Sequence, residues 1–256
     1  MKKQVDLNSD LGESFGAYKI GMDEEVLSYV SSANIACGYH AGDPLIMEKT
    51  VKMALEKGAA LGAHPAYPDL MGFGRRKMDV SPKENYAYVL YQLGALFAFA
   101  KVKGARLQHV KAHGAMYNAA SDNEELARGI IEAVLAFDPE IILLCRSLSP
   151  MARLGEKMGA RVAQEVFADR AYNEDGSLVS RKLPGAVIED EEEVIKRARR
   201  MVLEGEVETV TGKVIPIQAD SICVHGDNPQ AVLFVKKIRQ ALEAEGVEIK
   251  PFGEFL

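Results

Sequence analysis

The 256-residue sequence predicts an α/β protein, an irregular (β/α) barrel with about seven parallel strands. Short apolar runs alternate with longer segments of helical periodicity, which favours parallel strands joined by right-handed crossovers. Polar residues cluster near the carboxyl end of nearly every predicted strand, as the mouth of a barrel requires. An open doubly wound sheet also fits this order, but it would concentrate such residues at one switch point.

The predicted strands are short, apolar and bounded by turn residues. They are expected at Gln4–Asn8, Ala33–Cys37, Ala59–His64, Leu107–His113, Ile141–Cys145, Arg161–Phe167 and Ser221–His225.

Capping residues and prolines mark the helix starts. Asp43-Pro44 is expected to cap a helix that ends at Gly58, and Ser81-Pro82-Lys83-Glu84 is a capping box for a helix that runs to Gly104. The segment Ser121-Asp122-Asn123-Glu124 is predicted to repeat this capping box. Further helices are expected from Ser149-Pro150, over Glu191–Glu204, and from Asn228-Pro229 to near Gly246.

Two long loops, Pro65–Val80 and Ala168–Gly185, interrupt the regular spacing. Loops of this length in a compact domain are functional lids or disordered segments. A small hairpin is expected within Glu206–Ile217. Because no linker-like stretch is present, we expect residues 1–256 to form one barrel domain.

The composition excludes several classes of protein. Hydrophobic residues make up 48% of the chain, which excludes disorder, and the net charge of −6 argues against nucleic acid or an anionic membrane as the main partner. Three cysteines without a CxxC motif favour a reducing compartment. With no apolar signal stretch at the N-terminus and no run of about 18–20 apolar residues, we expect a cytoplasmic protein.

Two of the predicted strands carry polar residues along one face. Burying carboxylates, imidazoles and a lysine inside a barrel is costly unless they pair with one another or with a ligand. The two faces are therefore either structural ion pairs or a functional site, and their direction toward the mouth favours a functional site. Their members are Asp6, Asn8 and Asp10, and His109, Lys111 and His113.

Four of the five histidines lie at the carboxyl ends of predicted strands, and they are His40, His64, His113 and His225. Histidines with nearby carboxylates could bind zinc or another divalent ion. No ligand pair has the local spacing of HExxH, however, and acid–base chemistry without a metal needs only a carboxylate or a neutral imidazole near substrate and water. The sequence leaves a divalent metal open.

The first long loop carries Arg75 and Arg76 after two glycines. Arginine is suited to clamping a carboxylate or a phosphate, and a solvated surface pair is the alternative. Asp227 is expected to cap a helix, whereas Asp43 can both cap and bind. The chain has neither a Walker A loop nor a GxGxxG motif, so no nucleotide site is predicted.

Six long motifs between residues 6 and 227 resemble the LamB/YcsF family, although Ala112 stands where the family more often has proline. The motifs are Asp6-Leu-Asn-Ser-Asp10-Leu-Gly-Glu13; Ala33-Asn-Ile-Ala-Cys-Gly-Tyr-His40-Ala-Gly-Asp43; Gly62-Ala-His64-Pro-Ala-Tyr-Pro-Asp69 with Gly72-Phe-Gly-Arg-Arg76; Val110-Lys-Ala-His113-Gly-Ala-Met-Tyr117-Asn118; Glu165-Val-Phe-Ala-Asp169-Arg170; and Ser221-Ile-Cys-Val-His225-Gly-Asp227.

The resemblance implies a component of an ATP-dependent 5-oxoprolinase, which opens the lactam of 5-oxo-L-proline (pyroglutamate) to L-glutamate together with partner subunits B and C. It also implies a deviant (β/α) barrel similar to the glycoside hydrolase/deacetylase group. Because the chain has no phosphate-binding loop, we expect the partner subunits to bind ATP, the co-substrate of the complex.

In this hypothesis, Asp10 or His113 activates water, while His40 and His64 stabilise the developing charge. The substrate carboxylate is expected to bind Arg75, Arg76 or Lys111. The remaining substrate-binding candidates are Asn8, Asp43, Asn118 and His225.

Two rival functions stay open. One is a metal-dependent deacetylase or amidohydrolase that acts alone on a sugar or a small amide. The other is a non-catalytic regulator that binds a carbohydrate or a metabolite. A homo-oligomer is compatible with each of these functions.

Overall fold

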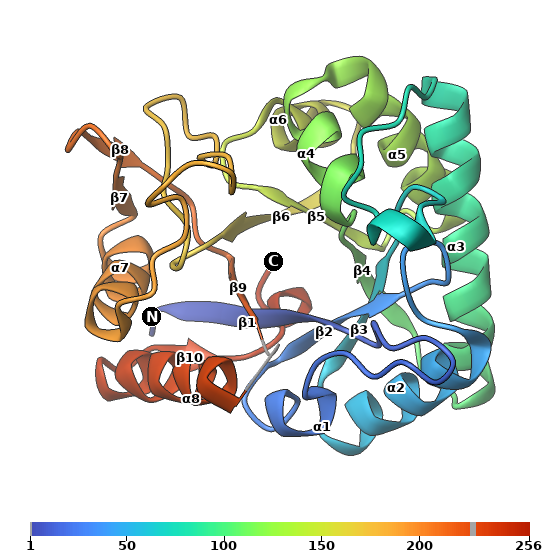
Figure 1. Ribbon diagram of the computed structural model, residues 1–256, viewed down its shortest axis with the longest axis horizontal. Helices are drawn as coiled ribbons and strands as arrows, with labels where there is room; N and C mark the ends of the chain where they lie inside the picture. Colours follow the sequence, from blue (N-terminus) through green and yellow to red (C-terminus); the bar gives the residue numbers. More distant parts are fainter. Residues whose placement is uncertain (1, 226–228) are drawn as a thin grey trace.

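The computed structural model describes residues 2–225 and 229–256, and within them seven parallel strands close a barrel surrounded by helices (Figure 1). Neighbouring strands pair in chain order, and the last pairs with the first, so that Asp6 lies opposite Ser221. The predicted barrel is confirmed. Its strands are β1 (Gln4–Leu11), β2 (Ser32–Ala36), β3 (Ala60–His64), β4 (Leu107–Val110), β5 (Ile142–Arg146), β6 (Arg161–Val166) and β9 (Ser221–Val224).

Strand β4 is shorter than predicted because it ends at Val110 and not at His113. The next residues still follow β3, since the backbone N–H of Lys111 donates to the carbonyl of Ala63 and that of His113 to the carbonyl of Pro65. Lys111 and His113 therefore keep the inward orientation that the strand pattern predicts, and both are buried.

Most helices begin where capping residues predict. Asp43 accepts from the backbone N–H groups of Leu45 and Ile46, and Ser81 forms a complete capping box with Glu84. The helices at predicted positions are α2 (Pro44–Glu56), α3 (Pro82–Val102), α6 (Pro150–Lys157), α7 (Glu191–Leu203) and α8 (Pro229–Ala244). Residues Asp227 and Asn228, the expected caps of α8, lie outside the described residues.

The predicted capping box at Ser121 is wrong. Ser121 is buried near the end of an unpredicted helix, α4 (Gly114–Asp122), where its hydroxyl donates to the carbonyl of Tyr117. The extended residue Asn123 instead caps α5 (Glu124–Phe137) by accepting from two backbone N–H groups. The sequence also did not predict the short helix α1 (Asp23–Val26).

Both long loops are present. The first contains only a short 3₁₀ turn, η1 (Leu70–Gly72), and the hairpin expected after α7 forms from β7 (Glu206–Glu208) and β8 (Val214–Pro216). Two short elements near the C-terminus were not predicted: β10 (Glu248–Ile249), which pairs with β1, and η2 (Phe252–Glu254).

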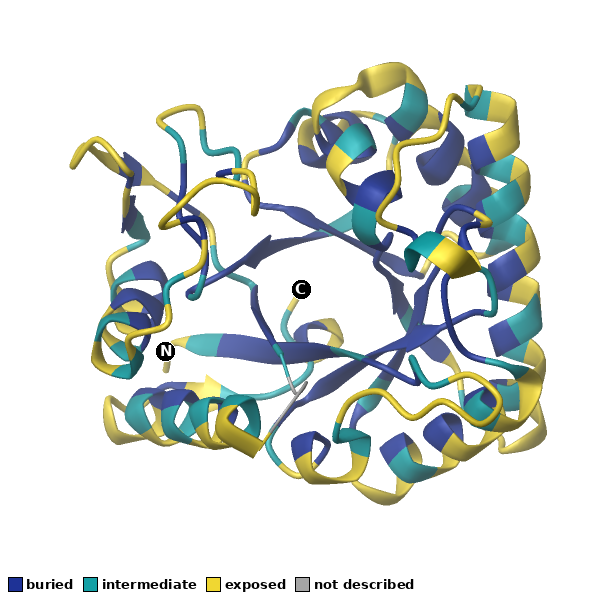
Figure 2. Cartoon of the chain, viewed as in Figure 1, coloured by how far each residue is buried: buried dark blue, intermediate teal, exposed yellow. Residues whose placement is uncertain are grey.

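The strands are buried and the helices expose their outer faces (Figure 2). The end of the barrel at which the strands begin is sealed by Phe252, which is fully buried against Ile142, Leu144 and Ala163. Accordingly, the C-terminus lies near the middle of the ring of strands in Figure 1. Functional side chains are therefore accessible from the other end, where the strands finish.

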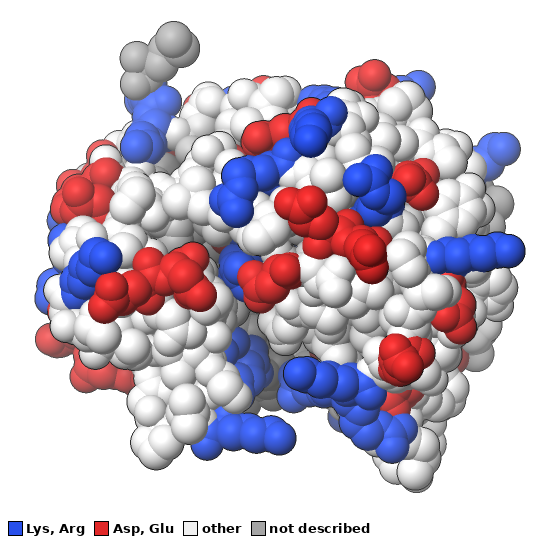
Figure 3. Space-filling view, turned by 90° about the horizontal axis from the view of Figure 1, so that it is seen from above, with Lys and Arg blue, Asp and Glu red and all other residues white. Residues whose placement is uncertain are grey.

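The surface carries mixed charge. On the face in Figure 3, basic and acidic side chains are interspersed, so the net charge of −6 does not create a single acidic field there. Among the described residues, no helix is both long enough and apolar enough to cross a membrane.

Candidate active site

The deepest polar layer of the barrel is centred on Asp6. Its carboxylate accepts hydrogen bonds from Ser31 and Ser32, each at 2.6 Å, and from Ser221. Burial raises the pKa of Asp6 to about 6 even though these hydroxyl groups act in the opposite direction. The side chain is fully buried, so Asp6 connects β1 to residues of neighbouring strands at the bottom of the site and does not face its mouth.

Above this layer, amide groups connect the strands. The side-chain NH₂ of Asn34 donates to Asn8 at 2.7 Å and to Asp10 at 2.9 Å. His109 Nε2 lies 2.7 Å from the amide oxygen of Asn34, and burial lowers the pKa of His109 to about 3, so its ring is neutral. The absence of a side chain at Gly62 makes room for this ring, because a Cβ there would lie 2.0 Å from His109 Nε2.

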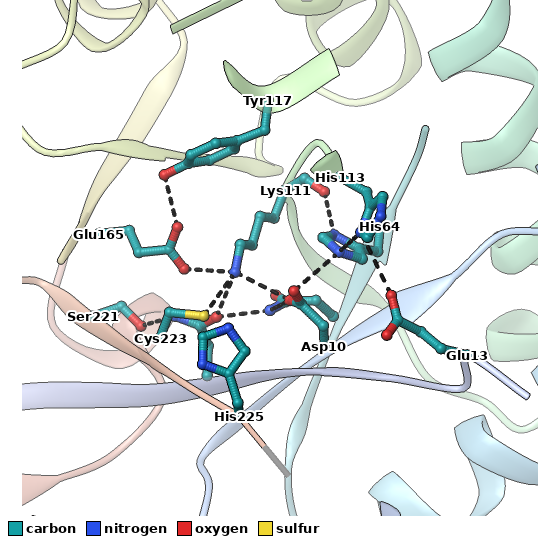
Figure 4. Close-up of polar contacts among 12 residues, drawn as sticks. Asp10, Glu13, His64, Lys111, His113, Tyr117, Glu165, Ser221, Cys223 and His225 are labelled. Carbon is teal, nitrogen blue, oxygen red and sulfur yellow. Dashed lines mark hydrogen bonds and ion pairs between the residues drawn. The ribbon is translucent and has the colours of Figure 1, made fainter. Parts of the chain in front are cut away.

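The ammonium of Lys111 lies at the centre of the site (Figure 4). It contacts Glu165 Oε1 at 2.7 Å, Asp10 Oδ1 at 3.1 Å and Asn8 Oδ1 at 3.2 Å. Burial alone would lower the pKa of Lys111, but the negative charges of Asp10 and Glu165 outweigh it and hold that pKa well above its ordinary value. Lys111 is therefore a fixed buried cation.

Three histidines and Glu13 meet beside Asp10, at the rim of the barrel. Glu13 Oε1 lies 2.9 Å from His40 Nε2 and 3.5 Å from His113 Nδ1. His64 Nε2 lies 2.9 Å from His113 Nδ1 and 3.3 Å from Asp10 Oδ2. The rings of His40 and His113 stack at a centroid distance of 3.7 Å. The sequence predicted that all three histidines share a site, and the structure brings them together.

The electrostatics favour uncharged rings for His40 and His113. Burial lowers the pKa of His40 well below its ordinary range, with a further contribution from His64. The pKa of His113 is lowered in the same way by burial and by the two neighbouring histidines. Conversely, burial and the charge of Asp10 raise the pKa of Glu13. Burial would raise the pKa of Asp10, but its interactions with His64 and Lys111 outweigh burial and hold that pKa well below its usual value. Asp10 is thus a carboxylate at neutral pH.

The first long loop covers the cluster. Phe73 has a left-handed backbone conformation with φ of 54°, and its carbonyl accepts from His113 Nε2 at 2.8 Å. Gly74 then passes so close to His40 and His113 that a Cβ would lie 2.8 Å from an atom of each. The loop therefore fixes the orientation of His113.

The two arginines of this loop have different environments. Arg76 pairs with Asp69, within the loop itself. The guanidinium of Arg75 lies 5.0 Å from the centroid of the Phe73 ring, is exposed, and forms no ion pair within residues 2–225 and 229–256. Of the two, Arg75 is the one that is available to a ligand.

His225 lies on the opposite side of the mouth, where Nδ1 is 3.0 Å from Asp169 Oδ2. Burial would lower the pKa of His225, but Asp169 outweighs this effect and raises it. Asp169, Arg181, Cys223 and His225 line a cavity of about 470 Å³. This cavity has room for a small molecule, and its lining includes an acidic residue, Asp169, and a basic one, Arg181.

Asp43 and Asn118, which the sequence also predicts to bind substrate, form no hydrogen bond or ion pair with Lys111 or the histidines that the structure describes. Asp43 accepts from Gly16 N–H at 2.7 Å as well as from its own helix, so it also holds the loop after β1. Asn118 is exposed on α4. Their roles in substrate binding stay predictions.

Sequence reasoning missed several residues that complete the site. Each of them lies within one of the six family motifs. The residue that each one contacts is distant in the sequence, so a local spacing pattern does not predict the contact. Tyr117 donates to Glu165 at 2.7 Å, although the two residues are 48 positions apart. The missed residues are Glu13, Phe73, Tyr117, Glu165 and Asp169.

The chain is similar to known proteins over almost its whole length. The chain is 58% identical over 253 residues to the 5-oxoprolinase A subunits of Pyrococcus horikoshii and of Campylobacter jejuni, covering 99% of each chain. The structure matches the lactam utilization protein from Thermus thermophilus with a TM-score of 0.92 and 48% identity, covering 96% of this chain and 99% of that one. The LamB/YcsF family matches residues 5–256, and the chain therefore belongs to the LamB/YcsF family.

Proposed function

We propose that this chain is the ring-opening component of an ATP-dependent 5-oxoprolinase that converts 5-oxo-L-proline to L-glutamate. The observation that carries this proposal is the 58% identity, over almost the full length, to proteins named as the A subunit of 5-oxoprolinase. The buried Asp10–Lys111–histidine site, which is suited to hydrolysis, supports it. In this proposal residues 1–256 act as one catalytic domain.

A lactam is a resonance-stabilised amide that water attacks slowly, and coupling to ATP overcomes this inertness. Transfer of the γ-phosphoryl group to the lactam oxygen makes the ring carbon more electrophilic. Addition of one water and cleavage of the ring C–N bond, with a proton taken up by nitrogen, gives γ-glutamyl phosphate. A second water then yields glutamate and phosphate, so that one ATP and two waters are consumed.

Asp10 is our choice for the base that activates water. Its carboxylate is ionised, and its side chain is 22% exposed, more than those of His64, His113 and Glu13 beside it. Asn34, whose side-chain NH₂ donates to Asp10 Oδ1 at 2.9 Å, orients this carboxylate. Lys111, a fixed cation 3.1 Å from Asp10, stabilises negative charge that develops on the substrate.

Arg75 is our choice for binding the substrate carboxylate, because Arg76 is already paired with Asp69. His225 and Arg181 line the neighbouring cavity and add positive charge beside the site. We propose that partner subunits B and C bind ATP, since the chain contains no phosphate-binding loop. The three unpaired, buried cysteines support a cytoplasmic location.

The test is 5-oxoproline-dependent ATP hydrolysis in a reconstituted complex, with and without this chain. We expect glutamate and phosphate to form in equal amounts only when this chain and its partners are all present. Glutamate formation by this chain alone without ATP would overturn the proposal in favour of a stand-alone amidohydrolase. Tight binding of a metabolite without any turnover would favour a regulator.

A further inference from the structure

We propose that Glu13, His40, His64 and His113 form a binding site for one divalent transition-metal ion. Their candidate ligand atoms all lie within 4.8 Å of one another, and the side chains are buried except for Glu13, of which 12% is exposed. The proposed function does not include this metal site, and whether the ion binds does not depend on which substrate the enzyme uses.

The main evidence for this site is the hydrogen bonding of the His64 and His113 rings. His64 Nδ1 lies 2.7 Å from the carbonyl oxygen of Lys111, and His113 Nε2 lies 2.8 Å from that of Phe73. A carbonyl oxygen only accepts, so each of these nitrogens carries the ring proton. In neutral rings, the remaining nitrogens, His64 Nε2 and His113 Nδ1, both present lone pairs, and they face each other at 2.9 Å.

Two facing lone pairs repel each other unless a proton or a cation lies between them. A second proton would place a full positive charge on a buried ring, and the ring of His113 is stacked on that of His40 at a centroid distance of 3.7 Å. A metal ion removes the repulsion without charging either ring. Metal-bound histidines characteristically donate their other N–H to a carbonyl or a carboxylate, and both rings here already do so.

The other ligand atoms complete the set. Glu13 Oε1 lies 3.5 Å from His113 Nδ1 and 2.9 Å from His40 Nε2. A tetrahedral zinc ion with bonds of 2.0–2.1 Å separates its ligand atoms by roughly 3.3 Å. The spacings in the cluster lie on either side of that value, so small side-chain movements suffice. His40 Nδ1 is buried and has no hydrogen-bond partner among the described residues, so Nε2, which faces Glu13 Oε1, is the nitrogen that belongs to the cluster.

The donor set indicates the class of metal. Three imidazoles and one carboxylate suit zinc, cobalt or nickel, whereas magnesium and calcium prefer oxygen ligands. Asp10 Oδ2 lies 3.3 Å from His64 Nε2, one of the four candidate ligand atoms. For the hydrolysis proposed above, an ion at this position would supply a Lewis acid next to the base.

The experiment uses the full chain, treated with a chelator and then titrated with Zn²⁺, and separately with Co²⁺ to record the visible absorption of a tetrahedral complex. We expect one equivalent per chain, a rise in the thermal midpoint on addition of metal, and at least tenfold weaker binding in His64→Gln and in Glu13→Gln. Thermal midpoints measured without metal show whether each variant is folded. Glu13→Gln, a change at the rim, keeps the test valid if the His64 variant does not fold.

His225→Gln is the matched control because His225 lies outside the cluster and pairs with Asp169. Binding of one equivalent should be unchanged in this variant. Failure of the wild-type chain to bind Zn²⁺ below millimolar concentration would overturn the proposal, as would equal affinity in the wild type and both cluster variants. None of these readouts uses catalysis, so this inference and the proposed function fail separately.

Discussion

His113 donates through Nε2 to the carbonyl oxygen of Phe73 at 2.8 Å, and Phe73 holds the left-handed backbone conformation that non-glycine residues rarely adopt. The strained residue thus supplies the acceptor that fixes the ring of His113. The next residue, Gly74, lets the loop approach the histidines closely. Strain of this kind is typical of functional sites, and here it pre-organises the acceptor.

Replacing Gly74 by alanine should disturb the site more than the fold. Gly74→Ala places a Cβ at 2.8 Å from His40 and His113, whereas Gly104→Ala, also at positive φ, meets open space. Each change should cost about 1–2 kcal/mol of stability from the backbone conformation alone. In the reconstituted complex, we expect glutamate formation to fall about 10²-fold only in Gly74→Ala. Equal activities in the two variants would show that the loop does not position the histidines.

Arg75→Gln should raise the KM for 5-oxoproline roughly 10–100-fold, the value of one charge-assisted hydrogen bond to a carboxylate. Arg76→Gln is the matched control, since Arg76 pairs with Asp69 within the same loop. Steady-state kinetics of the complex measure both. Our assignment would be wrong if the KM rose equally in both variants or only in Arg76→Gln.

Asp6 should make the protein less stable as the pH rises. Its pKa of about 6 in the folded state exceeds the value of 3.8 for an ordinary aspartate, so the folded protein holds the proton more tightly than the unfolded chain. The resulting stability is complete below pH 4 and is lost between pH 4 and pH 6, a change of about 3 kcal/mol.

Asp6→Asn removes this titration. We expect its free energy of unfolding, relative to the wild type, to increase by about 3 kcal/mol between pH 4 and pH 7 in urea denaturation. Other buried acids such as Asp23 titrate in both proteins, so their contributions cancel in the difference between the two free energies of unfolding. A difference that does not vary with pH would refute the raised pKa.

Phe252→Ala should lower the free energy of unfolding by about 3–5 kcal/mol, because it opens a cavity at the sealed end of the barrel. The Phe252 ring is fully buried and lies 5.0 Å from that of His109. Leu256→Ala, a change at an exposed residue, should stay within about 0.5 kcal/mol of the wild type. Comparable losses in the two variants would contradict the role of Phe252 as a plug.

Much of the fold could be predicted because local signals and tertiary packing agree. The caps at Asp43 and Ser81 and the apolar strand runs each specify one element, and the alternation of strands and helices specifies parallel pairing. Prediction failed where tertiary contacts decide. Ser121 has the sequence of a cap, yet it is buried inside α4, and the burial of Phe252 depends on contacts with residues of distant strands.

The site could be predicted only in part for the same reason. Period-two alternation identified Asp10 and Lys111 as inward-facing residues, and strand ends identified the histidines. The partners of these residues come from elsewhere in the chain: Glu165 contacts Lys111 from β6, and Glu13 reaches His40 from the loop after β1. Such pairs depend on how the barrel closes, and no spacing along the sequence encodes them.

The most direct test of the central claim, that this chain opens the lactam at Asp10, is glutamate formation from 5-oxoproline by the reconstituted complex that contains Asp10→Asn. This variant keeps the size of the side chain and removes the base 3.1 Å from Lys111. We expect the rate to fall at least 10²-fold, while Asp138→Asn, a change of the same kind at an exposed residue, leaves it unchanged. A wild-type rate in a folded Asp10→Asn complex would contradict the claim.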